Sequence, residues 1–443
     1  MSASTTTVSE PTPASAAPTD TTTDDLLLAA AEAGDRGEVA RLLTGGGHAY
    51  YQRDSDGMSV LMAAASSGEA GVVTLLLEKG APWNAVDRAG KCAGEYALGN
   101  SHQHVVDDLV NAGVRAEMIL GAMARNQKQK HACSAKYLER SVRYEKDRLI
   151  DEEDDAVMME WETPIMQTHA AVLVPVEGEG DVLNIGFGMG IVDKAIQARR
   201  PTSHTIIEAH PEVYKKMLAD GWDTKPGVTI LFGRWQDVLP HLLVQGTGEG
   251  TGEGTGEGTA GSVSAAADVS ASSSSASSSA PCAMYDGIFY DTYGEYDADM
   301  RELHQLFPRI LRKGGLYSFF NGLCPGNIFF HGVACQVVQL ELAGMGLEAE
   351  FIPCEFSGPQ LDSEQWEGVK RSYYWSDTYY LPLCRMLGGD GDGDGDGDGD
   401  GDGDGGGEAK EAKEDAVASE AAEGGALGAA VGDTKRQKVA GEI

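Results

Sequence analysis

Short apolar runs alternate with amphipathic stretches over residues 151–387 of the 443-residue chain. Runs this short suit strands that are buried on both faces of a parallel sheet. The amphipathic stretches, such as residues 212–218 and 300–311, have the spacing of helices that cover a sheet. The pattern therefore predicts an α/β domain with a doubly wound sheet. Its expected strands are residues 182–185, 205–207, 228–231, 285–290 and 316–320.

A different pattern repeats itself ahead of this domain, over residues 24–115. Residues 29–34 return as residues 63–68, and Gly57 returns as Gly90 after 33 residues. This period, with one turn and two short helices in each unit, resembles that of ankyrin repeats. A generic bundle of helical hairpins is the alternative, but the register holds at several positions. Stacked repeats leave a concave surface, which predicts an all-α unit that binds a protein.

Three segments have compositions that cannot bury a core. Residues 246–280 run from Gly-Thr-Gly-Glu repeats into a Ser/Ala tract, residues 388–443 are rich in Gly, Asp, Ala, Glu and Lys, and residues 1–23 are rich in Ser, Thr, Ala and Pro. We expect all three to be disordered. The first is an insert at a loop of the α/β domain, where extra length costs little. Residues 116–150 are expected to form a helix and a linker that begin the α/β domain.

The net charge and the cysteine pattern argue against some classes of ligand and site. The formal net charge is −35, and the tail from residue 388 contributes only −11 of it. An acidic body repels phosphate backbones, which argues against direct binding of nucleic acid. The seven cysteines are scattered without a C-x-x-C pair, which argues against disulfides and against a metal site.

The same features bear on location. No apolar run is long enough for a membrane span, and the N-terminal residues contain no apolar signal region. A reducing compartment, and hence the cytoplasm, is the simplest location for such cysteines. The basic cluster at residues 435–438 would also fit a nuclear signal, although a solvated tail is the favoured interpretation.

A glycine-rich turn follows the first expected strand, with Gly186, Gly188 and Gly190. Glycines let the backbone turn tightly and approach a ligand closely. Glu208, at the end of the second expected strand, is well placed to accept hydrogen bonds from two ribose hydroxyls. The dinucleotide fingerprint G-x-G-x-x-G requires glycine at position 191, where this chain has Ile191. The form G-x-G-x-G resembles the turn of methyltransferases that bind S-adenosylmethionine.

Two carboxylates indicate what such a site would act on. Asp291 follows the fourth expected strand, at the edge where ligands of open α/β sheets bind. Glu162 lies in a segment ahead of the first strand that would act as a lid, and two carboxylates can grip a guanidinium through paired hydrogen bonds. Taken singly, Glu162 also fits a surface glutamate and Asp291 a strand-end cap. Gly314 and Gly315 fit a helix that ends just before the fifth strand, or an ordinary C-cap.

Five motifs in this order resemble guanidinoacetate N-methyltransferase: residues 158–164 (MMEWETP), 186–189 (GFGM), 206–208 (IIE), 233–237 (GRWQD) and 290–293 (YDTY). With an ankyrin-like unit ahead of them, they resemble the type IV protein arginine N-methyltransferases of fungi and plants. The resemblance covers nearly all of residues 24–387. It implies a class I methyltransferase (Rossmann-like) fold, S-adenosyl-L-methionine as cofactor, and methylation of the internal (δ) nitrogen of arginine in a protein. It also points to a ribosomal protein as substrate.

The resemblance implies roles for single residues as well. Glu162 and Asp291 fall on the carboxylates that bind the guanidino group, and Asp291 is the one expected to take up the departing proton. The chain departs from the small-molecule enzyme at two places: it has Gly190 where that enzyme has alanine, and residues 322–324 (GLC) where that enzyme has Leu-Thr-Ser. These differences change the contacts to the far end of a small substrate, which fits a larger substrate. The positions that match cofactor contacts are Tyr137, Met158, Met166, Phe187, Gly188, Met189, Gly190, Ile191, Val192, Glu208, Ala209, His210, Arg234, Trp235 and Asp291.

Other functions are weighed against this one. The ordinary protein arginine methyltransferases carry a double-glutamate loop and a Thr-His-Trp motif, and the chain has neither, which disfavours dimethylation of a terminal nitrogen. One alternative is a small-molecule guanidino N-methyltransferase. Another is a non-catalytic ankyrin scaffold with a degenerate methyltransferase fold, against which intact Glu208, Glu162 and Asp291 argue.

Overall fold

The computed structural model describes residues 22–126, 133–245, 285–295, 297–355, 364–374 and 378–388. Within them the chain forms two compact units, which join in the sequence between Ala116 and Glu117, and each is described by itself. The expected insert at 246–280, nearly all of the expected tails and the basic cluster at 435–438 lie outside the described residues. No helix in the described part of the chain is long and apolar enough to cross a membrane.

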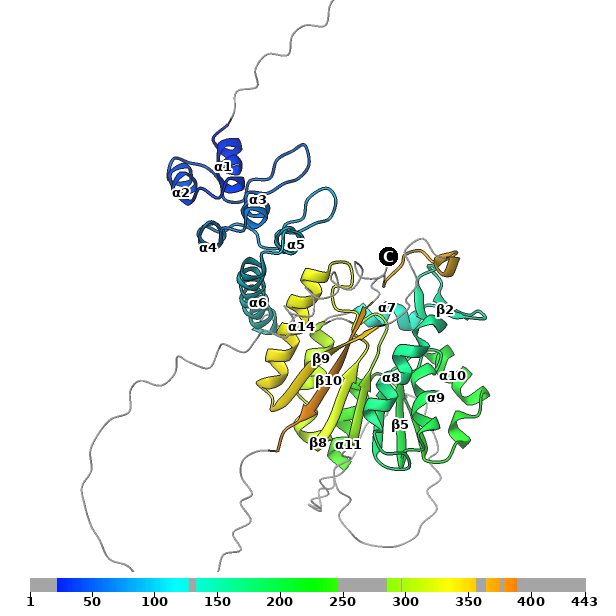
Figure 1. Cartoon of the computed structure of the whole chain (residues 1–443). Coiled ribbons are helices and arrows are strands. Elements are labelled where there is room, and N and C mark those ends of the chain that lie inside the picture. Colours follow the sequence, from blue (N-terminus) through cyan, green and yellow to red (C-terminus); the bar gives the residue numbers. More distant parts are fainter. Residues whose placement is uncertain are drawn as a thin grey trace, which may run out of the picture. The chain divides into compact units, whose positions relative to one another are not determined.

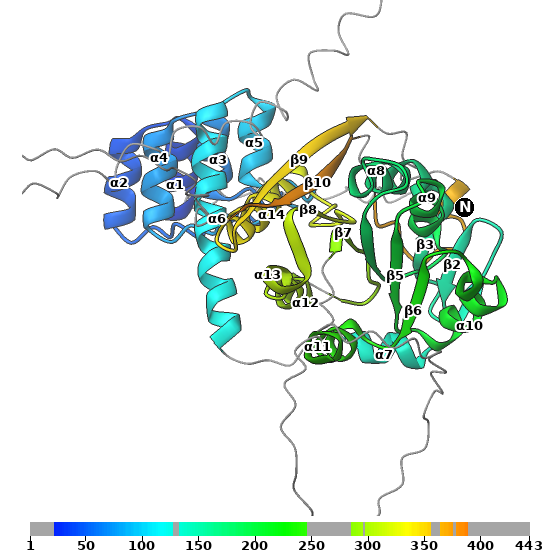
Figure 2. The ribbon, with the colours of Figure 1, turned by 90° about the horizontal axis from the view of Figure 1, so that it is seen from below.

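The N-terminal unit consists of helix pairs joined by tight turns (Figure 1). Helix α3 packs against both α1 and α5, and the three lie side by side (Figure 2). Gly57 and Gly90 adopt φ angles of +77° and +80° at equivalent turns, so the expected repeat is confirmed. The helices are α1 (Thr23–Glu32), α2 (Arg36–Thr44), α3 (Val60–Ser67), α4 (Ala70–Glu78), α5 (Ala93–Gly99) and α6 (Gln103–Asn126).

Polar side chains cap the N-termini of α1 and α3. The Thr22 hydroxyl accepts from the Asp25 N–H at 3.1 Å, and the Ser59 hydroxyl accepts from the Met62 N–H at 3.1 Å. A cap of this kind stabilises a helix by about 1 kcal/mol. α6 crosses the boundary between the two units and continues to Asn126, within the stretch from residue 116 in which a helix and a linker are expected.

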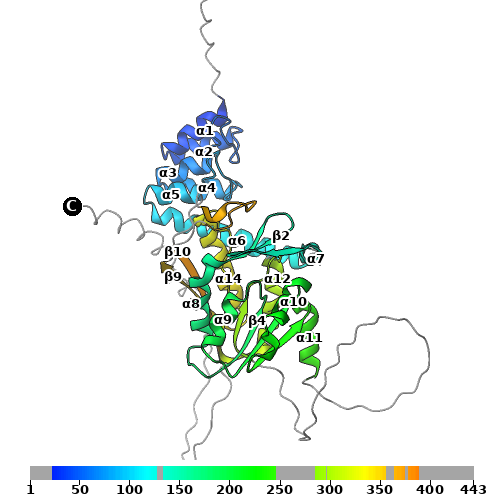
Figure 3. The ribbon, with the colours of Figure 1, turned by 90° about the vertical axis from the view of Figure 1, so that its right-hand side faces the viewer.

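After the end of α6, the second unit continues with a small lid. It consists of α7 (Cys133–Glu139) and an antiparallel sheet of β1 (Val142–Tyr144), β2 (Arg148–Asp151) and β3 (Ala156–Met159), followed by the short helix η1 (Glu160–Glu162). Both β2 and α7 lie at one end of the main sheet (Figure 3). Contacts described below connect this lid to the glycine-rich turn.

The main sheet has seven strands in the order β6-β5-β4-β7-β8-β10-β9. The first five are parallel, and β10 runs antiparallel to β8 and to β9. The expected parallel strands are therefore confirmed, whereas the two strands at the β9 edge were not expected. The strands are β4 (Asp181–Ile185), β5 (Ser203–Glu208), β6 (Val228–Phe232), β7 (Tyr285–Tyr290), β8 (Leu311–Phe319), β9 (Leu347–Glu355) and β10 (Thr378–Met386).

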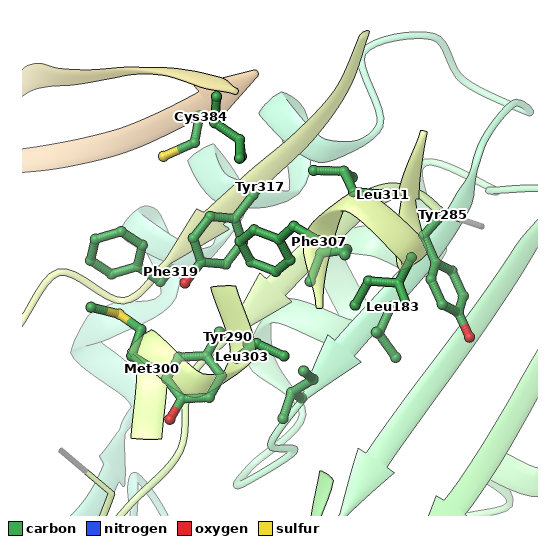
Figure 4. Packing of buried hydrophobic residues seen from close by; sticks show 14 of the residues in the cluster. Leu183, Tyr285, Tyr290, Met300, Leu303, Phe307, Leu311, Tyr317, Phe319 and Cys384 are labelled. Atoms are coloured by element: carbon green, nitrogen blue, oxygen red, sulfur yellow. The ribbon is translucent and has the colours of Figure 1, made fainter. Parts of the chain in front are cut away.

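Helices cover both faces of this sheet (Figure 2), as a doubly wound class I methyltransferase fold requires. One face carries α8 (Thr163–Leu173), α9 (Ile191–Ala198) and α10 (Pro211–Ala219), with η2 (Trp222–Thr224) beside them. The other carries α11 (Trp235–Gln245), α12 (Asp297–His304), α13 (Phe307–Ile310) and α14 (Ile328–Ala343). On this second face Phe307 and Tyr317 pack with ring centroids 4.5 Å apart, and Phe319 lies next to them (Figure 4).

Two expectations about local structure were wrong. The stretch 300–311 forms two helices rather than one, because Pro308 lacks an N–H to donate and stands at the start of α13. Gly314 and Gly315 do not precede the fifth strand but lie within β8, which already pairs with β7 at Leu311. The pairing register shifts across this part of β8, and Gly314 takes a φ of +77° there.

Candidate active site

The glycine-rich turn between β4 and α9 brings two strand ends into contact. Gly186, Gly188 and Gly190 have φ angles of +95°, +54° and +66°, which a residue with a Cβ adopts only with strain. A Cβ on Gly186 would lie 1.9 Å from the carbonyl oxygen of Asp291. The Asp291 N–H donates in turn to the Ile185 carbonyl at 3.0 Å. Glycine at 186 therefore lets the end of β7 approach the turn, with Asp291 beside it.

Glu208 ends β5 with its carboxylate against the same turn. Its Oε2 accepts from the Phe187 N–H at 2.9 Å, and its Oε1 accepts from the His210 N–H at 2.6 Å. Burial raises the pKa of Glu208, and these backbone donors oppose the rise. Because a carboxylate has about four acceptor sites, two hydrogen bonds leave capacity for the hydroxyls of a ligand.

A pocket lies at the carboxyl ends of β4, β5, β6 and β7, the edge at which open α/β sheets bind ligands. Nine residues expected to contact the cofactor line it: Tyr137, Met158, Phe187, Gly188, Glu208, Ala209, Arg234, Trp235 and Asp291. Nine others line it that are not among the expected cofactor contacts, and most of them are neighbours of such a residue in the sequence. They are Leu138, Val157, Ile185, Gly186, Ile207, Gly233, Thr292, Tyr293 and Glu295.

Six expected cofactor residues do not line the pocket: Met166, Met189, Gly190, Ile191, Val192 and His210. Met166 and Val192 are instead buried in the core between the helices and the sheet. His210 caps α10, where its Nδ1 accepts from the Glu212 N–H at 3.2 Å. Met166 of α8 and Val192 of α9 therefore belong to the core behind the pocket, whereas the His210 ring packs against the Tyr137 ring of the lid.

Aromatic residues of the lid cover the pocket. The Tyr137 ring lies 4.8 Å from the His210 ring and 4.8 Å from the Tyr293 ring. The Tyr144 hydroxyl of β1 donates to the Gly188 carbonyl at 2.9 Å. The lid is therefore connected to the glycine-rich turn by a hydrogen bond as well as by ring packing.

Glu295, which no sequence pattern singled out, accepts four hydrogen bonds from two neighbouring segments, the start of α11 and the end of β7. Its carboxylate receives the Trp235 Nε1–H at 2.9 Å and a Gln236 amide proton at 2.7 Å, both from the start of α11. It also receives the hydroxyls of Tyr290 at 2.6 Å and Thr292 at 3.0 Å, which flank Asp291. One side chain thus fixes the segment after β6 and the segment after β7.

Asp291 and Glu162 form the acidic end of the site. Asp291 lines the pocket, and its carboxylate makes no hydrogen bond to any residue that the structure describes. Glu162 is 3 % exposed and does not itself line the pocket. Its Oε1 accepts from the Met159 N–H at 2.9 Å and from the Tyr373 hydroxyl, while Oε2 has no partner among the described residues.

Both carboxylates are hard to ionise in this environment. Burial raises the pKa of Glu162, and the negative charge of Asp291 raises it further. Burial also raises the pKa of Asp291, with a smaller contribution from the charge of Asp193. A bound cation would favour the ionised form of both. The pair is therefore suited to one delocalised cation that can donate hydrogen bonds to each carboxylate. No cluster of three or more metal-binding side chains occurs in the described ranges.

Comparisons with known proteins agree with this arrangement. The profile of guanidinoacetate N-methyltransferase matches residues 125–250, and that of ankyrin repeats, in three copies, matches residues 26–118. The chain is 32 % identical to protein arginine N-methyltransferase 2 of Aspergillus oryzae, over 72 % of this chain and 78 % of the relative.

Two further relatives have the same name. The chain is 33 % identical to protein arginine N-methyltransferase 2 of Candida glabrata, over 70 % of this chain and 77 % of the relative. It is 31 % identical to that of Saccharomyces cerevisiae, over 70 % of this chain and 76 % of the relative. Together with a methyltransferase sheet and a preceding ankyrin unit, these similarities mean that the chain belongs to the protein arginine N-methyltransferase 2 family.

Proposed function

We propose that the protein transfers a methyl group from S-adenosyl-L-methionine to the internal (δ) guanidino nitrogen of an arginine in a protein. The observation that carries this proposal is the pair Asp291 and Glu162, whose pKa values are raised and whose oxygens are incompletely paired beside the pocket. A guanidinium suits such a pair, because its planar N–H donors match carboxylates in geometry and charge.

Polar and apolar groups of the pocket support S-adenosylmethionine as the methyl donor. Glu208 retains acceptor capacity for the ribose hydroxyls. Gly186 and Gly188 allow the ligand to approach the backbone, and the rings of Phe187 and Trp235 offer surface for the base. When bound, this donor supplies a methyl group that is activated by the positive charge on its sulfur.

The chain's own residues orient the acceptor and remove a proton. Asp291 and Glu162 hold the guanidinium so that one nitrogen faces the methyl group, and such alignment lowers the barrier substantially. A cationic guanidinium must release one proton when its nitrogen gains a methyl group. Asp291 accepts that proton, because its carboxylate is otherwise unpaired among the described residues and its raised pKa suits a general base near neutral pH.

The polar groups of Arg234 and of the segment after β8 support an arginine within a polypeptide over a free guanidino acid. Arg234 is the one Lys or Arg side chain among the described residues that line it, and it follows β6, at the proposed donor end. After β8 the Leu323 N–H already donates to the Asn321 side chain at 3.4 Å, and the Gly322 N–H to the Phe320 carbonyl at 3.0 Å. A free carboxylate on the substrate would lose hydration there without gaining an equivalent partner.

The rest of the chain is consistent with a protein substrate. Ankyrin repeats stack into a concave surface that commonly binds proteins, and an acidic chain with a net charge of −35 attracts basic ones. A basic ribosomal protein, met in the cytoplasm, is the substrate that we expect from the family resemblance.

The test is methyl transfer from labelled S-adenosylmethionine into an extract of cells that lack the enzyme. Mass spectrometry of the hydrolysed protein then distinguishes δ-methylarginine from ω-methylarginine. Labelled δ-methylarginine supports the proposal, and ω-methylarginine alone contradicts the choice of nitrogen. Label in added guanidinoacetate but not in protein would favour a small-molecule enzyme, and donor binding without any transfer would favour a scaffold.

A further inference from the structure

A segment near the C-terminal end of the second unit lies along the lid. It comprises residues 364–374, including the short helix η3 (Glu364–Trp366), and we refer to it as the strap. The Lys370 N–H of the strap donates to the Asp154 carbonyl at 2.7 Å. The Arg148 guanidinium of β2 donates to the Glu367 carbonyl at 2.7 Å. The strap is therefore fixed to the β2–β3 hairpin, which leads directly to Glu162.

Ion pairs add to this attachment. Lys370 lies 3.0 Å from Glu153, and Arg371 lies 3.2 Å from Asp155, in the turn between β2 and β3. Both basic side chains are more than half exposed, and exposed pairs contribute little free energy. Their effect is to set which residue of the strap faces which residue of the hairpin.

Aromatic rings form the buried part of the contact. The Tyr373 ring lies 5.5 Å from the Trp161 ring and 5.2 Å from the Trp366 ring, and the two tryptophan rings are 6.0 Å apart. Trp366 also packs on Met159 of β3. Trp161 immediately precedes Glu162, so this aromatic cluster holds the strap close to the Glu162 carboxylate.

The Tyr373 hydroxyl donates to Oε1 of Glu162, the same oxygen that accepts the Met159 N–H. With both donors on one oxygen, Oε2 is left for a ligand. Three titratable groups in the described residues face Glu162: Asp291 at the end of β7, Tyr373, and Tyr379 of β10. The Tyr379 hydroxyl is already engaged, since it accepts from the Asn321 N–H and lies 2.8 Å from His169 Nε2.

We propose that Tyr373 is a positioning residue for methyl transfer: its hydroxyl fixes the Glu162 carboxylate so that Oε2 meets the arginine guanidinium. The proposal rests on the proposed role of Glu162 in binding the substrate. It makes the strap part of the substrate site, although Tyr373 is 211 residues away from Glu162 in the sequence. Tyr373 acts through Glu162 and need not touch the substrate.

The experiment compares Tyr373→Phe with Tyr374→Phe in the full chain. Tyr373→Phe removes the hydroxyl that donates to Glu162 and keeps the aromatic ring in its cluster. The second removes a neighbouring hydroxyl, which donates to the Thr378 carbonyl instead. The substrate is protein from the extract of cells that lack the enzyme. For Tyr373→Phe, kcat/KM for methyl transfer into this protein is expected to fall about 10- to 100-fold, which is the range for losing a hydrogen bond to a charged group. Tyr374→Phe is expected to retain its activity.

Two further readouts separate positioning from a loss of structure. The Kd for S-adenosylmethionine and the Tm of Tyr373→Phe should stay near those of the parent. The acidic limb of its pH profile should move to higher pH, because the Tyr373 hydroxyl lowers the pKa of Glu162. An unchanged profile with unchanged activity overturns the proposal.

A double-mutant cycle with Glu162→Gln completes the test. If Tyr373 acts through Glu162, Tyr373→Phe has little further effect once Glu162 is glutamine. Independent, multiplicative losses overturn the positioning role. If Glu162→Gln is impaired and Tyr373→Phe is normal, only this inference fails. If Glu162→Gln is fully active, the proposed role of Glu162 fails and the inference fails with it.

Discussion

Replacing Gly186 with alanine is expected to destabilise the catalytic unit. At a φ of +95° a Cβ costs about 1–2 kcal/mol. The same Cβ would lie 1.9 Å from the Asp291 carbonyl oxygen, and relief of that overlap requires the end of β7 to move, at a further cost of about 1–3 kcal/mol. A total of about 2–5 kcal/mol corresponds to a fall in Tm of roughly 4–20 °C for a domain of this size.

Activity is expected to fall as well, even where the variant is folded. The backbone that must move belongs to Asp291, and displacement of a catalytic group by about 1 Å can cost about 100-fold in rate. Calorimetry gives the Tm, and methyl transfer at a temperature well below that Tm gives the turnover of folded protein.

Gly178→Ala is the matched control. Gly178 has a φ of +88°, but a Cβ there would meet nothing within 4 Å. It should lose only the conformational part, about 1–2 kcal/mol, and keep full turnover. If Gly186→Ala melts at the same temperature as Gly178→Ala and is equally active, glycine is not needed at position 186 for the close approach of β7.

The site and the repeats lead to four further predictions. Asp291→Asn should leave the donor's Kd nearly unchanged in calorimetric titration while turnover falls by about 10²- to 10⁴-fold, so full activity would remove Asp291 from the mechanism. Because the pKa values of Asp291 and Glu162 are raised, kcat/KM should increase with pH through the near-neutral range, as the pair ionises while arginine stays charged; a flat profile speaks against a functional pair. The same shifts should lower the unfolding free energy in urea as pH rises above about 4, since the folded state binds protons that the unfolded state has released. Deletion of residues 1–102, which leaves α6 whole, should raise KM for protein more than for a free guanidino compound, and equal effects would indicate a merely structural unit.

Much of the sheet could be predicted because buried parallel strands need continuous apolar runs, which β4 and β7 display. β9 escaped prediction because Glu348 and Glu350 leave it without a continuous apolar run, and Pro353 argues against a strand. β10 escaped it because Pro382 argues against a strand inside a sheet. Both segments form strands because of their position within the sheet, and the strand propensity of their own residues does not predict it.

The site was predictable only as far as neighbours in the sequence are neighbours in space. The glycine-rich turn and Glu208 belong to one strand–turn–helix–strand unit, so their spacing alone indicated a pocket. Tyr373 reaches Glu162 across 211 residues, and no local pattern encodes that contact. Met166 was placed in the pocket by resemblance, but α8 turns this side chain into the core.

The Glu295 carboxylate implies that the two ligands of the enzyme do not bind independently. It holds Trp235 on the proposed donor side and Thr292, next to Asp291, on the proposed arginine side. A ligand that shifts one of these two segments therefore shifts the other through Glu295. By linkage, arginine should tighten donor binding by the same factor by which the donor tightens arginine binding. A competitive inhibitor that displaces Trp235 would lose this cooperativity. An inhibitor that links a donor analogue to a guanidinium would benefit from binding at the donor site and at the arginine site together.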